Sequence, residues 1–340
     1  MTIILDAMGS DKYPDPEIQA AVTAAEMFGE EIILVGNREL VEPKLKALNP
    51  GNLPVVIEDA PDLVEMGEKP VEAARRKPRN SMAVGLGLVK SGRGQAFVTA
   101  GNTGAAMFNG LRTLGRIQGV ARPGLTALFP VKGGHCAVVD IGANSECRPE
   151  FLLQFAVMGS LYVERVLHKP SPRVGLLSNG EEAGKGNTLT HDTFPLLEKS
   201  GLNFIGNVEG KELFGGEADV VVTDGFTGNI LLKSSEAVAK LLIDELRAEL
   251  MSSFPTRLGA LLAKPAFKNI KKLLDPAEIG AAPLLGIDGL VFVGHGRSDS
   301  RALVSAIRVA RQAVQVDLLE GLRQAIKDRL ALIESPTPVE

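Results

Sequence analysis

The sequence predicts an α/β protein whose mostly parallel sheet is covered by helices on both faces. Short β-branched runs alternate with segments of helical periodicity along most of the chain. Several of these runs, among them AVVDIG, ADVVVTD and RVGLLS, are apolar nearly throughout instead of at every second position. Continuous apolar strands that alternate with helices are typical of a parallel sheet that is buried on both sides.

The expected elements follow one another along the chain. The strands are Thr2–Asp6, Ile32–Gly36, Val55–Glu58, Gln95–Thr99, Thr126–Val131, Cys136–Ile141, Arg173–Leu177, Asn203–Gly206, Asp219–Thr223 and Gly289–Val293. The helices between them include Asp15–Phe28, Asn102–Leu114, Pro149–Leu167 and Gly228–Leu250. We expect one α/β domain over residues 1–333 and a flexible tail over residues 334–340.

Residues 251–274 interrupt this alternation. The stretch carries five basic residues and no acidic one. Its apolar residues lie on two helical faces, with Leu258, Leu261 and Leu262 on one and Ile270, Leu273 and Leu274 on the other. We expect a helical projection within the α/β domain. Apolar faces beside unopposed bases favour contact with an anionic membrane surface, and a dimer-packing arm is the alternative that the sequence leaves open.

Composition narrows the function classes. The net charge of −4 argues against a general nucleic-acid coat. The two cysteines, Cys136 and Cys147, form no CxxC pair, so neither a disulfide framework nor a thiolate metal site is indicated. The start, MTIILDAMGSD, lacks the pattern of a signal peptide, and no run approaches the ~18–20 apolar residues of a membrane span. These features favour a cytoplasmic protein.

Glycine and polar residues gather where the expected strands end. The clusters are DAMGSD (6–11), AGNTG (100–104), DIGAN (140–144), SNGEEAGKGN (178–187), GNVEG (206–210), DGFTGN (224–229) and GHGRS (294–298). At the carboxyl ends of parallel strands, all seven would meet at one edge of the sheet, where such folds bind ligands. Backbone N–H groups and side-chain amides there suit phosphate and oxyanions without a metal or cofactor. Helix capping and turn formation are the plainer explanation for each cluster alone.

Familiar nucleotide and hydrolase motifs do not fit. The run 180–186 resembles a P-loop, but its spacing differs and glycine follows the lysine where a magnesium-binding Ser or Thr belongs. The first strand–helix turn has no GxGxxG, and the chain has no GxSxG. Two alternatives to an anion-handling transferase stay open. One is a nicotinamide-dependent decarboxylating dehydrogenase on a related fold, which would need an adenosine site and metal-binding carboxylates that are not evident in the sequence. The other is a non-enzymatic phosphate-binding scaffold at the membrane.

Taken in order, the seven motifs resemble those of the bacterial phosphate acyltransferases, and the resemblance runs from Thr2 to about Leu332. It implies transfer of a long-chain acyl group from acyl carrier protein to inorganic phosphate. The acyl phosphate would then serve a membrane acyltransferase that acylates glycerol 3-phosphate in phospholipid synthesis. It also implies a fold similar to phosphotransacetylases and isocitrate/isopropylmalate dehydrogenases, and a cytoplasmic homodimer with peripheral membrane contact and no nucleic-acid partner.

The chemistry of such a transfer asks for few catalytic groups. Phosphate is itself a nucleophile, and a thiol with a pKa of ~8.5 is a tolerable leaving group. The site must hold phosphate beside the thioester and stabilise the oxyanion. We expect Lys185 to supply the cation and Asn187 and Asn229 to donate hydrogen bonds. Asp224 would orient Lys185 or accept a proton, and His295 would protonate the thiolate; capping and structural roles are the alternatives.

The remaining expected contacts lie in the same turns. The substrate- and phosphate-binding set also includes Asp6, Gly9, Asn102, Thr103, Gly104, Asn144, Ser178, Asn179, Gly180, Glu182, Gly186, Gly225, Gly228, Gly296 and Ser298. The helix Gly228–Leu250 and its neighbours are the expected lining of an acyl groove. For the acidic carrier protein, residues 75–79 (RRKPR) and the projection are two candidate docking patches, with a solvated turn as the alternative for the first.

Overall fold

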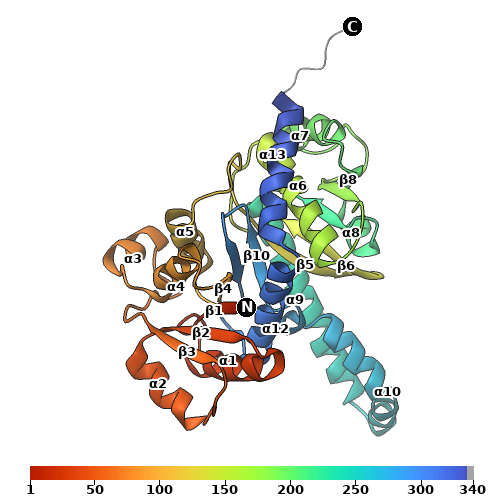
Figure 1. Ribbon diagram of the computed structural model, residues 1–340. Helices are drawn as coiled ribbons and strands as arrows, with labels where there is room; N and C mark the ends of the chain where they lie inside the picture. The colour runs from red at the N-terminus through yellow and green to blue at the C-terminus, as the bar shows by residue number, and fades with distance from the viewer. Residues whose placement is uncertain (335–340) are drawn as a thin grey trace.

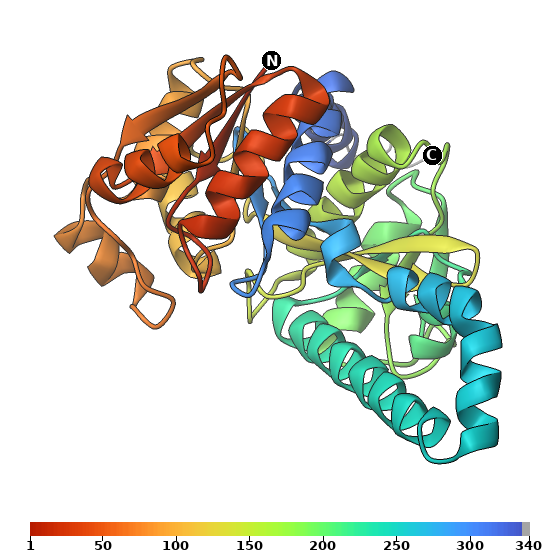
Figure 2. The ribbon, with the colours of Figure 1, turned by 90° about the horizontal axis from the view of Figure 1, so that it is seen from below.

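The computed structural model describes residues 1–334, except the side chains of residues 271, 272, 276 and 329–334. Within these limits the chain forms one sheet with helices packed on it and a helical hairpin that projects from it (Figures 1 and 2). The tail expected at 334–340 lies outside the described residues except for Glu334, which ends a helix.

Eleven strands form the described sheet, in the order β3-β2-β1-β4-β11-β10-β5-β6-β9-β7-β8. Their bounds are β1 Thr2–Asp6, β2 Glu31–Gly36, β3 Val55–Asp59, β4 Ala96–Thr99, β5 Gly124–Val131, β6 Gly134–Val139, β7 Val174–Leu177, β8 Phe204–Val208, β9 Val220–Val222, β10 Ala282–Leu285 and β11 Leu290–Val293. Ten of them match expected strands to within two residues at each end, and β10 was not expected.

The helices connect these strands. Their bounds are α1 Asp15–Phe28, α2 Arg38–Ala47, α3 Pro70–Arg76, α4 Ser81–Lys90, α5 Thr103–Thr113, α6 Pro149–Val166, α7 Thr188–Glu198, α8 Gly210–Gly215, α9 Gly225–Leu250, α10 Phe254–Leu273, α11 Pro276–Ile279, α12 Ser300–Gln315 and α13 Leu318–Glu334. The expected helix at Asp15–Phe28 has the predicted bounds.

Alternate residues of the strands enter two separate hydrophobic cores. In β1, Ile3 and Leu5 pack into the core under α1, α6, α12 and α13, whereas Ile4 packs into the core under α3, α4, α5 and α8. Figure 1 shows α12 and α13 running along one face through the centre of the molecule. The prediction of a mostly parallel sheet with helices on both faces is therefore confirmed.

The sheet reverses direction near its centre. β10 pairs antiparallel with both β11 and β5, and β5 pairs antiparallel with β6, whereas the other neighbours pair in parallel. As a result, β1, β4 and β11 point one way along the sheet, and β6, β7, β8 and β9 point the other way. The expectation that all seven polar turns share one edge is wrong, because β5 and β6 form an antiparallel hairpin that reverses the direction of β6 and of the strands beyond it.

The helices α9 and α10 pack against each other and form a hairpin that projects from the rest of the molecule (Figures 1 and 2). The hairpin includes most of the expected projection at 251–274. At its outer part, Leu258, Leu261 and Leu262 are 53%, 65% and 78% exposed. None of the described helices combines the length and the apolar character that a membrane-crossing segment needs.

Candidate active site

A large cavity lies between α9 and the centre of the sheet. Its volume is about 1090 Å³, and its apolar walls come from β5, α9 and the end of α10. The three apolar residues at the base of the projection, Ile270, Leu273 and Leu274, belong to this lining. The two apolar faces of the projection therefore differ in position, since only this one lines the cavity, although Ile270 and Leu273 are still about half exposed, at 49% and 50%.

Polar turns from both halves of the sheet reach this one cavity. From the turns after β4 and β11 come Asn102, Thr103, Gly104, His295 and Gly296. From the turns after β6 and β9 come Gly142 and Asn229. The reversal of the sheet thus does not scatter these turns to separate sites, because α9 spans from one group to the other. Four of the seven expected clusters contribute lining residues.

Two glycines allow α9 to begin directly against the turn after β6. A Cβ atom at Gly225 would lie 2.6 Å from the carbonyl oxygen of Asn144, and one at Gly228 would lie 1.9 Å from the carbonyl oxygen of Asp140. Only glycine permits such close packing. Asp224 caps the helix by accepting a hydrogen bond of 2.9 Å from the backbone N–H of Thr227. The side chain of Asp224 therefore acts as a helix cap, which is the alternative role that the sequence left open.

The turn that α9 meets is organised by one buried carboxylate. Asp140 accepts hydrogen bonds from the backbone N–H groups of Leu125, Gly142, Ala143 and Asn144, and from the Asn144 side-chain amide, at 2.7–3.1 Å. Burial raises the pKa of Asp140, and these hydrogen bonds oppose that rise. The residue fixes the turn in place, and with it the position of Gly142 beside the cavity.

The asparagines of the expected site differ in what their amides do. Asn102 and Asn187 cap α5 and α7, and Asn102 also donates to the backbone of Met66. Asn144 donates to Pro123 and Asp140. Asn229 lies at Gly142, whose added Cβ would be 3.8 Å from it, and makes no side-chain hydrogen bond within the described part of the chain. Its amide is therefore open to a ligand.

His295 is the imidazole that lines the cavity. Partial burial lowers the pKa of His295, and the positive charges of Arg297 and Lys233 lower it further, against the opposing effect of Glu236 and Asp11. These effects together favour the neutral imidazole over the imidazolium. In that form it offers one nitrogen as a proton acceptor and the other as a donor.

The turn after β1 packs against the turn after β4, which lines the cavity. Asp6 is buried, accepts from the Met8 N–H at 3.0 Å and from the Thr99 hydroxyl at 2.6 Å, and has a pKa that burial raises. A Cβ at Gly9 would lie 2.8 Å from the backbone nitrogen of Gly101, so the turns after β1 and β4 are in close contact. In the turn after β11, Ser298 is also buried, and its N–H donates to the His295 carbonyl oxygen at 2.8 Å.

The loop after β7 does not line this cavity. It carries seven expected residues, namely Ser178, Asn179, Gly180, Glu182, Lys185, Gly186 and Asn187. The Asn207 side chain holds the loop by donating to the Glu182 carbonyl oxygen at 2.9 Å. The Lys185 side chain is exposed and makes no ion pair with the described residues. Lys185 therefore does not line the cavity, and its expected role as the catalytic cation stays a prediction.

Sequence reasoning missed two charged residues of the cavity wall. Lys233 and Glu236 lie on α9, one and two turns beyond Asn229, and both line the cavity. The signal was present, because residues four apart on a helix share a face, and Asn229 and Lys233 are four apart. The expectation that this helix lines an apolar groove is confirmed as to position, since Leu232, Ala239 and Leu242 are among the lining residues.

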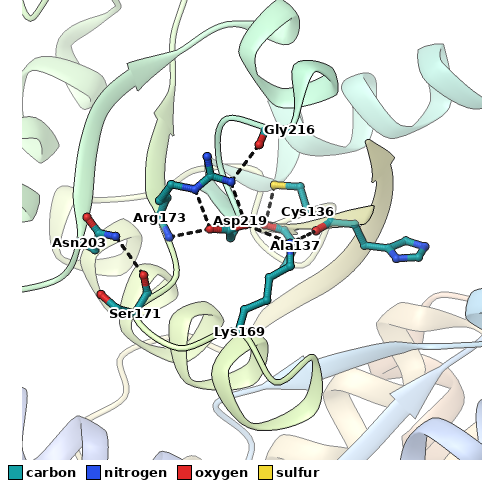
Figure 3. Close-up of polar contacts among 9 residues, drawn as sticks. Cys136, Ala137, Lys169, Ser171, Arg173, Asn203, Gly216 and Asp219 are labelled. Atoms are coloured by element: carbon teal, nitrogen blue, oxygen red, sulfur yellow. Dashed lines mark hydrogen bonds and ion pairs between the residues drawn. The ribbon is translucent and has the colours of Figure 1, made fainter. Parts of the chain in front are cut away.

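A second polar cluster sits at the amino-terminal end of β9 and is satisfied internally. Asp219 pairs with Arg173 at 2.9 Å and with Lys169 at 3.0 Å, and Arg173 also donates to the Gly216 carbonyl oxygen (Figure 3). Burial of Asp219 opposes its ionisation, but the hydrogen bonds from Arg173 and Lys169 prevail and lower its pKa to about 2. Because its charged groups pair with one another, this cluster stabilises the strand ends and leaves no charged group free for a ligand among the residues named here.

The basic run at 75–79 is largely neutralised by nearby acids. Arg76 pairs with Glu72 at 3.7 Å, Lys77 with Glu68 at 2.5 Å, and Arg79 with Asp59 at 3.2 Å. Exposed pairs of this kind contribute little to stability, yet they reduce the net positive field that an acidic partner would meet. The projection has no such compensation among its described side chains.

The comparisons place the chain in a family. A family model described as "Fatty acid synthesis protein" matches residues 1–320. A protein named Phosphate acyltransferase from Elusimicrobium minutum is 44% identical over 335 residues, covering 98% of each chain. One of the same name from Acidobacterium capsulatum is 47% identical over 311 residues, covering 91% of this chain and 92% of the relative. The chain belongs to the phosphate acyltransferase family. The expected enzyme class, acyltransferase, is thereby confirmed, and it favours this interpretation over the dehydrogenase and scaffold alternatives.

Solved structures support the fold. A phosphotransacetylase from Streptococcus pyogenes matches with a TM-score of 0.60 at 16% identity, covering 93% of this chain and 94% of that one. A 4-hydroxythreonine-4-phosphate dehydrogenase from Klebsiella pneumoniae matches with a TM-score of 0.52 at 15% identity, covering 93% and 98%. At such identities the likeness concerns the fold alone, and the expected similarity to phosphotransacetylases is confirmed.

Proposed function

We propose that this enzyme transfers a long-chain acyl group from acyl carrier protein to inorganic phosphate, giving an acyl phosphate. The observation that carries the proposal is the cavity itself, in which a long apolar wall adjoins an open amide, Asn229, and a neutral imidazole, His295. An apolar channel suits an alkyl chain, and amide donors suit an anion.

The transfer requires one bond to form and one to break. An oxygen of phosphate attacks the thioester carbonyl carbon, and the C–O bond forms as the carbonyl becomes an oxyanion. The C–S bond then breaks, its electron pair leaves with sulfur, and the resulting thiolate takes a proton. Asn229 would donate to the phosphate or the oxyanion. His295 would accept the phosphate proton and return it to the thiolate, which a neutral imidazole can do.

The loop residues fit this scheme as outer contacts. Lys185, exposed in the loop 178–187, would meet the negatively charged donor as it enters. An acyl carrier protein is acidic, and the α9–α10 hairpin offers exposed bases such as Lys264 and Lys268 on α10, the helix whose end lines the cavity. The acyl phosphate product would pass to the membrane acyltransferase that acylates glycerol 3-phosphate.

The exposed leucines of the hairpin support membrane contact. Phe254 and Leu262 are 80% and 78% exposed, in a segment whose described bases make no ion pair. Such a helix is suited to lie at an anionic membrane surface, where an acyl phosphate could be handed over without crossing water. We further propose that the enzyme is a homodimer, because exposed apolar residues along α9 that lie outside the cavity lining, including Phe226, Ile230 and Leu241, exceed what isolated surface residues explain.

The deciding experiment measures acyl phosphate by mass spectrometry after mixing acyl-(acyl carrier protein) and phosphate with the enzyme. We expect product with the wild-type chain and at least a tenfold loss with Asn229→Ala. Asn52→Ala, at an exposed position away from the cavity, is the matched control and should keep wild-type activity. Absence of acyl phosphate with the wild type would overturn the proposal, as would reduction of a nicotinamide cofactor by the same preparation.

A further inference from the structure

The cavity has one cationic side chain among the described residues that line it. That residue is Lys233, and neither an arginine nor a second lysine contributes to the lining. Lys185, the cation that the sequence favours, lies in a loop outside it. A reaction between phosphate and an acyl group held in this cavity needs positive charge beside the reacting oxygens, and the geometry offers it at position 233.

Lys233 is held where both groups of polar turns meet. On α9 it follows Asn229 by one turn, so the ammonium and the open amide share a face of the helix. On its other side, Glu236 pairs with Arg297 at 3.8 Å, which ties α9 to the loop after β11 that carries His295. Lys233 and His295 both line the cavity, and the positive charge of Lys233 is one of the causes that lower the pKa of His295. Amide, ammonium and imidazole are thus arranged along one stretch of the cavity.

The ammonium is also available to a ligand. Its described ion pair is with Glu236 at 3.4 Å, and the Lys233 side chain is 55% exposed. A half-exposed pair three residues apart on a helix contributes little, so a doubly charged anion can compete with the single carboxylate. By contrast, the structural cations Lys169 and Arg173 are each held by charged hydrogen bonds to the largely buried carboxylate of Asp219.

We propose that Lys233 binds the phosphate dianion in the cavity, and that it, and not Lys185, supplies the cation on which phosphate binding depends. This inference rests on the proposed function, since it concerns the phosphate of the same transfer. It adds a residue that the motif pattern does not indicate. In this arrangement Lys185 contacts the acyl donor, and Lys233 on α9 binds inorganic phosphate.

The test separates phosphate binding from turnover. Lys233→Met, Lys233→Arg and Lys185→Met are compared with Lys240→Met, a lysine on the same helix outside the cavity lining. Calorimetric titration with inorganic phosphate alone should show at least a tenfold weaker Kd for Lys233→Met, partial recovery for Lys233→Arg, and wild-type values for Lys185→Met and Lys240→Met. In steady-state assays, Lys233→Met should raise the KM for phosphate by about tenfold or more, with the KM for the acyl donor changed less than about twofold.

Each outcome decides one claim. Wild-type phosphate affinity in Lys233→Met, with thermal unfolding unchanged, overturns the inference while leaving the proposed function in place. Loss of phosphate binding in Lys185→Met but not in Lys233→Met also overturns it. If the wild type binds phosphate but forms no acyl phosphate, the proposed function fails, and the titrations still decide whether Lys233 holds the anion.

Discussion

The backbone of Gly228 lies so close to the carbonyl oxygen of Asp140 that a Cβ atom at position 228 would be 1.9 Å from it. Real Cβ atoms do not approach other atoms to under 3.0 Å, so any other residue must move one of the two segments. The contact joins the first turn of α9 to the turn after β6. It thereby sets where Asn229 and Lys233 stand in the cavity.

Gly228→Ala is expected to displace α9. The added methyl group would lower the free energy of unfolding by about 1–3 kcal/mol, as overpacking does. Because Asn229 would move with the helix, we also expect acyl phosphate formation to fall at least tenfold. Urea titration and the product assay give the two values. Gly87→Ala, in α4 with open space around it, is the control and should be neutral or slightly stabilising.

The apolar wall of the cavity should set how long a chain the enzyme accepts. Ala239 lines it, so Ala239→Phe would fill space that an alkyl chain needs. We expect activity with a long-chain acyl donor to fall about tenfold or more, and activity with a short-chain donor to change much less. Ala237→Phe makes the same substitution at an exposed position outside the lining. Equal loss on both donors, or equal loss in both variants, would contradict this assignment.

The outer part of the hairpin should decide membrane contact. Replacing Leu258 and Leu262 together with Glu puts two carboxylates on the exposed apolar face and opposes the attraction of the bases, which is worth ~1 kcal/mol each near anionic lipid. We expect co-sedimentation with anionic vesicles to be lost while acyl transfer in solution persists. The exposed pair Leu40 and Leu48, changed to Glu in the same way, should leave vesicle binding intact. Unchanged sedimentation of the hairpin variant would rule out this contact.

Glu17 should make the stability of the protein depend on pH. It is fully buried, its Oε1 accepts from the Ser10 N–H at 2.8 Å, and burial raises its pKa from 4.5 to about 7. Between these two values the folded chain binds more protons than the unfolded chain, so stability falls as pH rises through this window. The full change amounts to about 3 kcal/mol.

Glu17→Gln removes that titration and keeps an oxygen that can accept from Ser10. We expect its free energy of unfolding to lose less than that of the wild type between pH 4.5 and 8. Urea denaturation at intervals of pH measures the difference. Glu26→Gln, at an exposed position of the same helix, should follow the wild-type curve. If the wild-type and Glu17→Gln curves stay parallel, the buried carboxyl does not control this dependence.

Most of the sheet could be predicted from the sequence because its strands are short apolar runs with clear ends. β10 could not, since Ala282–Leu285 has only four residues, and its Pro283 argues against a strand in the middle of a sheet. The wrong expectation of one shared edge has a different cause, the antiparallel β5–β6 hairpin, since β10 is antiparallel to both of its neighbours and leaves β5 and β11 pointing the same way. The packing of alternate strand residues into two cores, one on each face of the sheet, could be predicted, because it follows from the continuous apolar character of the strands.

The site was harder to predict because the same residue types cap helices and bind anions. Asn102, Asn187 and Asp224 stand at positions where either role fits the sequence, and only the structure shows their side chains bonded to the backbone. The sequence pattern favours Lys185 as the cation because glycines flank it on both sides. Lys233 has no such neighbours, and its importance depends on where α9 lies relative to the sheet.

The late position of β10 and β11 in the chain has a consequence for biosynthesis. Between β4 and β5 the sheet continues only through these two strands, yet the ribosome reaches them at residues 282–293, after it has made nine others. A nascent chain therefore carries two blocks of sheet with bare borders at β4 and β5, which are open to pairing with neighbouring polypeptides. A chain that stopped before residue 282 would keep both borders open.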